Sequence, residues 1–248
     1  MLYDAAASLW LLGAFLLLLL MLAWLSRQIS LLIQLLIYHL TRSHDAPTVA
    51  IFLVFLPGVI IHEAAHWTVA RLLGLRTGKF RVWPKHQGRH IGLGSVSVQS
   101  KGAFTDSLVG LAPLVVGTVV VTLMGGHIVD AYDMSASLAG GRYLGALIAF
   151  WRALGKPDGA LWAYLLFAVA NAMMPSAADR EPVKPILLYS VLAATLYILL
   201  GLPLTPVASF MAQLTPALQT LISALLFTVI LDAAALVILW IIRLVVAR

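Results

Sequence analysis

The sequence predicts an all-α polytopic membrane protein with about six transmembrane helices and a small interfacial β-hairpin. Of the 248 residues, 62% are hydrophobic and only 10% are charged, whereas about 25% of residues are charged in an ordinary soluble domain. Apolar runs such as Leu9–Leu25 and Ala217–Ile242 approach or exceed the roughly 20 residues that a helix needs to cross the bilayer. These runs are apolar on every side, which excludes the alternating pattern of a transmembrane β-barrel.

Each candidate span is justified by its own composition. The first, Ser8–Leu40, is longer than the roughly 30 Å hydrocarbon layer, and we expect one tilted helix rather than a span followed by an interfacial helix. The second, Val49–Gly74, contains a Pro57-Gly58 pair that should bend it. The other four candidate spans are Leu108–Gly125, Gly159–Met174, Pro185–Leu202 and Ala217–Ile242.

The polar stretch after the second span is strongly basic. Seven of the sixteen Lys and Arg residues lie between Arg71 and Lys101, and no acidic residue occurs between Glu63 and Asp106. In a membrane protein such a segment is typical of a cytoplasmic anchor. The chain has no recognised nucleic-acid-binding module, so we expect the lipid bilayer and not a nucleic acid as the partner of this charge.

Two segments outside the spans have their own patterns. Phe80–Trp83 and Ile91–Gln99 are rich in β-forming residues and are separated by the turn-like stretch Pro84–His90, which predicts a hairpin. An open strand edge cannot face lipid, so the hairpin must lie at the interface or against the protein. Leu138–Trp151 has the pattern of an amphipathic helix that lies on the surface.

The second span carries an H-E-x-x-H motif, formed by His62, Glu63 and His66. On a helix this spacing stacks the two imidazoles, as a tetrahedral Zn²⁺ requires, and places Glu63 beside them to activate a water molecule. With seven His and two Glu in the chain, chance would produce the motif about 0.002 times. The alternative is a hydrogen-bonded polar knot that joins helices.

A catalytic zinc usually takes three protein ligands and keeps one position for water. The chain has no cysteine, so His and carboxylates must hold any metal. If the basic segment is cytoplasmic, the two histidines lie toward that side of the second span. The fourth span then returns to the same side and delivers Asn171, Pro175 and Asp179 there.

These features together resemble the site-2 protease family of intramembrane zinc metallopeptidases. His62, Glu63 and His66 lie in a transmembrane helix, and a hairpin and a further span precede Asn171 and Asp179. The family's second motif has an Asn, a Pro, and an Asp eight residues after the Asn, and Asn171 to Asp179 keeps that separation. The resemblance implies that Glu63 is catalytic, and that His62, His66 and Asp179 bind zinc.

The second motif departs from the family pattern in two ways. Pro175 lies four residues after Asn171, where the family has proline at three. Ala178 and Arg180 replace the Leu and Gly that usually flank the aspartate. These departures leave Glu181 as an alternative third ligand, because a glutamate would also complete a zinc site.

The aspartate of the second motif has a simpler alternative role. Asp179 would then be an interfacial residue paired with Arg180 or Lys184.

Two further polar residues have open roles. Asn171 is expected to donate a hydrogen bond to the substrate carbonyl or developing oxyanion, or else to form an interhelical amide bond. Asp232, deep in the last span, would accept a hydrogen bond from His62 or His66, or would be protonated and hydrogen-bonded between helices.

The resemblance covers Val49–Pro185. It implies a single membrane domain over residues 1–248, with a peptidase core at 49–185 and flanking transmembrane helices at 1–48 and 186–248. We expect zinc-assisted hydrolysis of a peptide bond in or near a transmembrane segment of a single-pass protein, and the composition suggests a bacterial inner membrane. The alternatives are an ion- or proton-coupled transporter and a non-catalytic relative that binds membrane segments.

Overall fold

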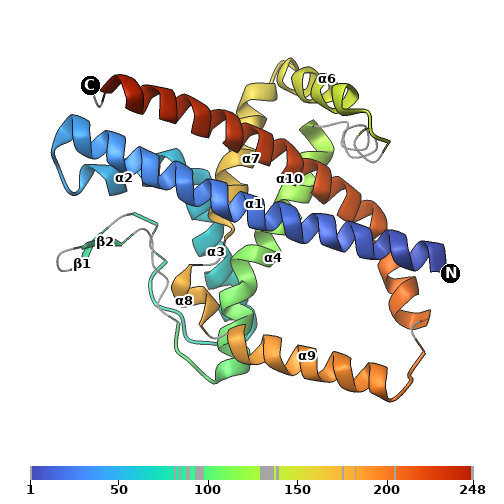
Figure 1. The fold of residues 1–248 in the computed structure, drawn as a ribbon. Helices are drawn as coiled ribbons and strands as arrows, with labels where there is room; N and C mark the ends of the chain where they lie inside the picture. Colours follow the sequence, from blue (N-terminus) through green and yellow to red (C-terminus); the bar gives the residue numbers. More distant parts are fainter. Residues whose placement is uncertain are drawn as a thin grey trace.

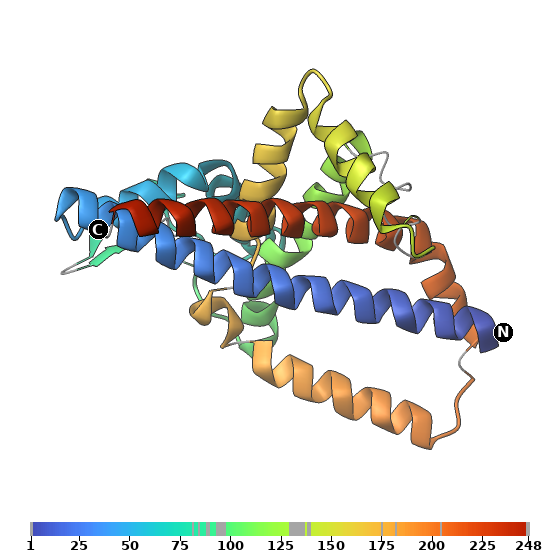
Figure 2. The same ribbon diagram turned by 45° about the horizontal axis from the view of Figure 1, so that its top comes forward.

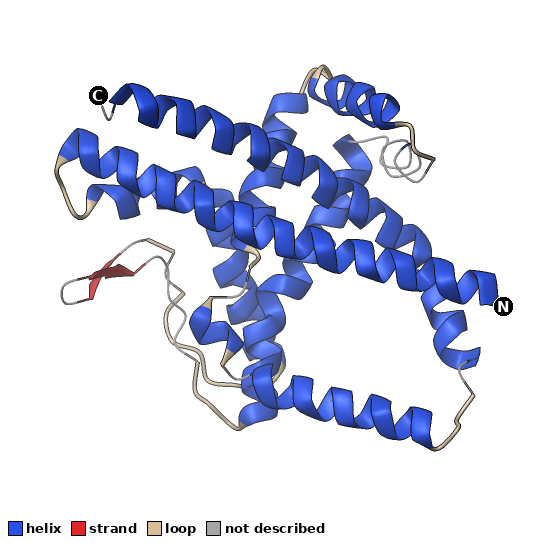
Figure 3. Cartoon of the chain, viewed as in Figure 1, coloured by secondary structure: helices blue, strands red, loops and turns tan. Residues whose placement is uncertain are grey.

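The structure is a computed structural model, and helices dominate it, which confirms the all-α prediction (Figure 3). It describes residues 2–80, 82–83, 85–87, 90–92, 98–128, 137, 140–174, 176–181, 183–203 and 205–246. The elements are α1 (Leu2–Thr41), α2 (Ala46–Val54), α3 (Leu56–Leu72), β1 (Lys85–Gln87), β2 (His90–Gly92), α4 (Ala103–Ile128), α6 (Tyr143–Leu154), α7 (Gly159–Ala172), α8 (Ala177–Arg180), α9 (Val183–Leu199) and α10 (Thr205–Val246).

The helices form two groups that cross each other. The long helices α1 and α10 lie side by side (Figure 1). Helices α3, α4 and α7 contact one another and run across that pair (Figure 2). The core lies where the groups meet, and it buries Leu22 of α1, Val121 of α4, Leu166 of α7 and Phe227 of α10. Helix α9 extends away from this core and exposes most of its large apolar side chains, as a helix that faces lipid does.

Three described helices are long and apolar enough to cross a membrane: Trp10–Thr41, Ala103–Gly126 and Thr205–Val246. Helices α2 and α3 make a fourth candidate if the bent pair counts as one span. These helices are compatible with an integral membrane protein. The expected count of six spans is not met in the described part of the chain. Helices α7 and α9 have 14 and 17 residues, fewer than the about 20 that a span needs.

Among the predicted helix ends, the start of α10 differs most from the structure. Helix α1 is one continuous helix of 40 residues, as we expected for the first segment, and is about 60 Å long. Helix α10 begins at Thr205, well before the expected start at Ala217, because the helix continues through Pro216. The surface helix expected at Leu138–Trp151 corresponds to α6, and residues 138–139 lie outside the described part.

The strand pair is smaller than the predicted hairpin and lies elsewhere in the segment. Strands β1 and β2 pair antiparallel through three residue pairs. The pairing starts at Lys85, inside the stretch Pro84–His90 that we expected to turn. Phe80 and Trp83 are not in a strand, and the expected strand Ile91–Gln99 includes residues that the structure does not describe.

The aromatic residues that suggested a strand pack against helices instead. The ring of Trp83 lies 5.4 Å, centroid to centroid, from that of Phe52 in α2. The ring of Phe80 lies 6.4 Å from that of Trp67 in α3. Ring contacts with α2 and α3 therefore compete with cross-strand pairing for these side chains, which stay exposed.

The chain bends by 82° between α2 and α3, which confirms the predicted bend. The break falls at Phe55, and Pro57 lies in the first turn of α3, where its missing N–H costs nothing. Gly58 lies on the face of α3 that meets α7. A Cβ atom there would overlap the carbonyl oxygen of Ala168, so glycine permits the close approach that brings His62 to α7 one turn later.

We expect Gly58→Ala to destabilise the protein by about 1–3 kcal/mol, because the added methyl group forces α3 and α7 apart. Gly13→Ala is the matched control: no atom lies within 4 Å of the position of its added Cβ, and alanine is the better helix former. Thermal unfolding in detergent, followed by circular dichroism, measures both. An equal effect of the two substitutions would contradict the account of Gly58.

Candidate metal centre

The H-E-x-x-H motif lies in the middle of α3, which is continuous from Leu56 to Leu72. His62 and His66 therefore project from successive turns of one helix, and their Nε2 atoms are 3.2 Å apart. Glu63 is buried in the same helix, with 8% of its surface exposed. The motif has the helical placement that the spacing predicted.

Asp179 reaches the two histidines from α8, a single turn that follows α7. Ser176 caps this turn through a reciprocal capping box. The N–H of Asp179 donates to Ser176 Oγ at 3.3 Å, and the N–H of Ser176 donates to Asp179 Oδ2 at 2.8 Å. Held in this way, Asp179 Oδ1 lies 3.2 Å from His66 Nε2, and Oδ2 lies 3.7 Å from His62 Nε2.

The outer nitrogens of both rings are bound to the backbone. Nδ1 of His62 lies 2.8 Å from the carbonyl oxygen of Ala172, and Nδ1 of His66 lies 2.9 Å from that of Val109. A carbonyl oxygen only accepts, so each Nδ1 carries the hydrogen and donates it. Each Nε2 of the neutral ring then presents a lone pair. Two lone pairs and the carboxylate of Asp179 converge on one point, and a cation there would remove their mutual repulsion.

The three groups lie close enough together to hold a metal ion. Ligand atoms about 2.0–2.1 Å from a tetrahedral ion lie about 3.3 Å apart. The two Nε2 atoms are 3.2 Å apart, Asp179 Oδ1 lies 3.2 Å from His66 Nε2, and the other carboxyl oxygen, Oδ2, lies 3.7 Å from His62 Nε2. One ligand atom from each of the three residues lies within 4.8 Å of the other two, so His62, His66 and Asp179 together could hold a metal ion.

The two candidate carboxylates lie in different surroundings. Burial opposes ionisation of Asp179, but a His66 ring that carries a proton on Nε2, together with the hydrogen bonds from Ser176, outweighs burial and holds the pKa of this carboxyl well below its usual range. Glu181 is outside the cluster, with 72% of its side chain exposed, and Lys184 Nζ lies 2.7 Å from its Oε1. The hydrogen bond and charge of Lys184 lower the pKa of Glu181.

Asn171 joins α7 to α10. Its amide nitrogen donates to the carbonyl oxygen of Phe167 at 2.9 Å and to Asp232 Oδ1 at 3.0 Å. The bond to Asp232 is the interhelical amide bond that we gave as the alternative for Asn171. Asp232 accepts from Asn171, whereas the outer nitrogens of His62 and His66 face backbone carbonyls. A contact of Asn171 with substrate stays a prediction.

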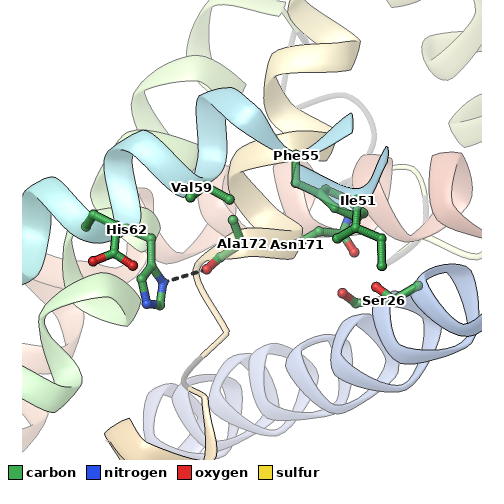
Figure 4. Close-up of a pocket in the computed structure, with 9 residues that line it drawn as sticks. Ser26, Ile51, Phe55, Val59, His62, Asn171 and Ala172 are labelled. Carbon is green, nitrogen blue, oxygen red and sulfur yellow. Dashed lines mark hydrogen bonds between the residues drawn. The ribbon is translucent and has the colours of Figure 1, made fainter. Parts of the chain in front are cut away.

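A cavity of about 200 Å³ lies beside the centre, between α1, the bent pair α2 and α3, and α7. Figure 4 shows His62, bonded to Ala172, at one end of this cavity and Ser26 of α1 at the other, with Asn171 between them. Glu63 also lines it. The cavity therefore lies against two residues of the motif, His62 and Glu63.

Sequence reasoning missed two kinds of contact. The carbonyls of Val109 and Ala172 orient the rings, but a backbone carbonyl leaves no mark in the sequence. Ser176 does leave a mark, because a Ser three residues before an acidic residue is the pattern of a capping box. That pattern could have identified how Asp179 is held.

Comparison with known proteins finds no match among protein-family models, curated proteins or solved structures.

We expect Asp179→Asn to reduce zinc affinity by more than about 100-fold, the upper end of the cost for outer-shell partners, because it removes a charged ligand. Glu181→Gln is the matched control and should keep the parental affinity, since its side chain faces solvent and Lys184. Competition with a chromophoric chelator measures both. Loss of zinc in Glu181→Gln with retention in Asp179→Asn would show that the wrong carboxylate is assigned.

We expect Ser176→Ala to lower zinc affinity about tenfold and to remove about 1 kcal/mol of capping energy, because Asp179 loses its hydroxyl partner. Ser209→Ala is the control: its hydroxyl donates to Pro206 in the exposed first turn of α10. The same chelator competition applies. Equal affinities for the two variants would rule out the capping box as the holder of Asp179.

Proposed function

We propose that the protein is an intramembrane zinc metallopeptidase that hydrolyses a peptide bond in or near a transmembrane segment of another membrane protein. One observation carries this proposal: the Nε2 atoms of His62 and His66 and the carboxylate of Asp179 converge, so that one ligand atom from each residue lies within 4.8 Å of the other two. They do so in a helical, largely apolar protein whose long helices are compatible with a membrane.

The donor set supports zinc over other ions. Two imidazole nitrogens and one carboxylate oxygen form a three-ligand set typical of catalytic zinc, whereas Mg²⁺ and Ca²⁺ prefer oxygen ligands. Both rings donate their outer N–H to a carbonyl, which is the usual outer shell of a zinc-bound histidine. His62, His66 and Asp179 would hold the ion and leave one position open.

Glu63 is the residue we assign as the general base and acid. When bound, zinc supplies Lewis acidity that acidifies a water molecule and polarises the scissile carbonyl. Glu63 is buried next to His62 and lines the same cavity, which supports a role in which it would accept the proton of the attacking water molecule and pass it to the leaving nitrogen. A glutamate in an apolar helix costs at least about 2.5–3.5 kcal/mol on insertion scales, which favours a functional role.

The substrate we propose is a segment that unwinds inside the membrane. Its peptide bonds are shielded while they form helical hydrogen bonds, so residues such as Gly or Pro that weaken a helix would favour cleavage. The cavity that His62 and Asn171 line would receive such a segment. Strand addition at the hairpin is less well supported, because β1 and β2 form only three residue pairs.

The other functions make different demands on the same site. An ion- or proton-coupled transporter would need its buried carboxylates for transport and not for cleavage. A non-catalytic relative that binds membrane segments would not need Glu63 at all. We place the protein in a bacterial inner membrane, on the strength of its Ala-, Leu- and Arg-rich composition.

We expect Glu63→Gln to retain one equivalent of zinc and to lose at least about 100-fold of its cleavage of a co-expressed single-pass substrate, because general-base catalysis contributes about 10²–10⁴-fold. Glu181→Gln serves as the matched control and should cleave normally. Cleavage is followed by the appearance of the shortened substrate on a gel. Normal cleavage by Glu63→Gln would reject the mechanism, and zinc-free protein that conducts ions would favour the transporter.

A further inference from the structure

One buried acidic residue has no role in the proposed chemistry. Asp232 of α10 has no exposed surface, and Asn171 of α7, with 5% exposed, donates to its Oδ1 at 3.0 Å. Within the described part of the chain, the second oxygen of Asp232 and the amide oxygen of Asn171 have no hydrogen-bond partner. The bond between the two side chains therefore compensates for only part of the cost of burying them.

The bond to Asp232 acts on the last turn of α7. The carbonyls of that turn have no partner inside the helix and are free to accept from other groups. Ala172, the residue next to Asn171, uses its carbonyl oxygen to accept from His62 Nδ1 at 2.8 Å. The position of this carbonyl decides which way the His62 ring turns and where its Nε2 points.

Two side-chain bonds hold Asn171 in place. Its amide nitrogen also donates to the carbonyl of Phe167, one turn earlier in α7. Asp232 is the partner from outside the helix, and it lies in a helix that also packs against α1 and α4. Without Asp232, the end of α7 would lose its polar link to α10.

We infer that Asp232 is a positioning residue of the metal centre: through Asn171 it fixes the last turn of α7, whose Ala172 carbonyl orients the ring of His62. This inference rests on the proposed metal centre. It assigns Asp232 no contact with metal or substrate. The acceptor oxygen is what matters, so a side chain of the same shape with an amide oxygen should serve equally well.

The test compares Asp232→Leu with Asp232→Asn in the full-length protein. We expect Asp232→Leu to lower zinc affinity about tenfold, the low end of the cost for outer-shell partners, and to alter the visible absorption spectrum of the cobalt-substituted protein. Asp232→Asn should restore both, because its amide oxygen accepts the bond from Asn171. Thr228→Val is the matched control. Thr228 is fully buried in the same helix, but its hydroxyl donates to Ala224 one turn away.

A second variant covers the case in which Asp232→Leu fails to fold. Asn171→Leu should produce the same loss of zinc affinity and the same spectral change. Combining it with Asp232→Leu should add little, because both substitutions remove the same bond between Asn171 and Asp232. Parental affinity and spectrum in Asp232→Leu or Asn171→Leu would overturn the inference, as would a loss in Asp232→Asn equal to that in Asp232→Leu.

The outcome separates this inference from the proposed function. If His62→Ala and Asp179→Asn abolish zinc binding while Asp232→Leu leaves it unchanged, the metal centre stands and the role of Asp232 is rejected. If His62→Ala and Asp179→Asn both bind zinc normally, the metal centre itself is rejected.

Discussion

The site depends on one electrostatic constraint: three electron-rich atoms converge in the interior of an apolar helix bundle. Nε2 of His62, Nε2 of His66 and the carboxylate of Asp179 would repel one another without a cation between them. The carbonyls of Val109 and Ala172 fix this arrangement, because each takes the outer hydrogen of one ring. A bound metal ion and a backbone carbonyl would thus hold each imidazole from opposite sides, which is how zinc sites keep histidine in place.

The packing of small residues makes this convergence possible. Gly58 lets α3 approach α7, and the carbonyl at the end of α7 meets His62 one turn further along α3. Gly117 of α4 likewise lies against Met173, just beyond the end of α7. In a membrane, where the hydrophobic effect does not drive helices together, close approach at small residues supplies the packing energy. Helices α3 and α4 therefore both pack closely against the end of α7, next to the residues of the site.

The sequence identified the parts of the site whose signal is local. The spacing of His62 and His66 placed both on one helix face, and the separation from Asn171 pointed to Asp179. The number of transmembrane spans was harder to predict from the sequence, because α7 has the apolar composition of a span but ends after 14 residues. The β-rich segment does form a strand pair, but the pair starts at Lys85, and the rings of Trp83 and Phe80 contact α2 and α3 instead. The partner of Asp232 depends on how α7 meets α10, which no local pattern records.

The central claim is that one zinc ion is bound by two imidazoles and one carboxylate. X-ray absorption spectroscopy at the zinc edge, on protein purified in detergent and loaded with one equivalent of zinc, tests it most directly. We predict a four-coordinate shell of nitrogen and oxygen at about 2.0–2.1 Å, with the outer-shell scattering of two imidazole rings. A protein that takes up no zinc, or a spectrum without imidazole scattering, would contradict the claim.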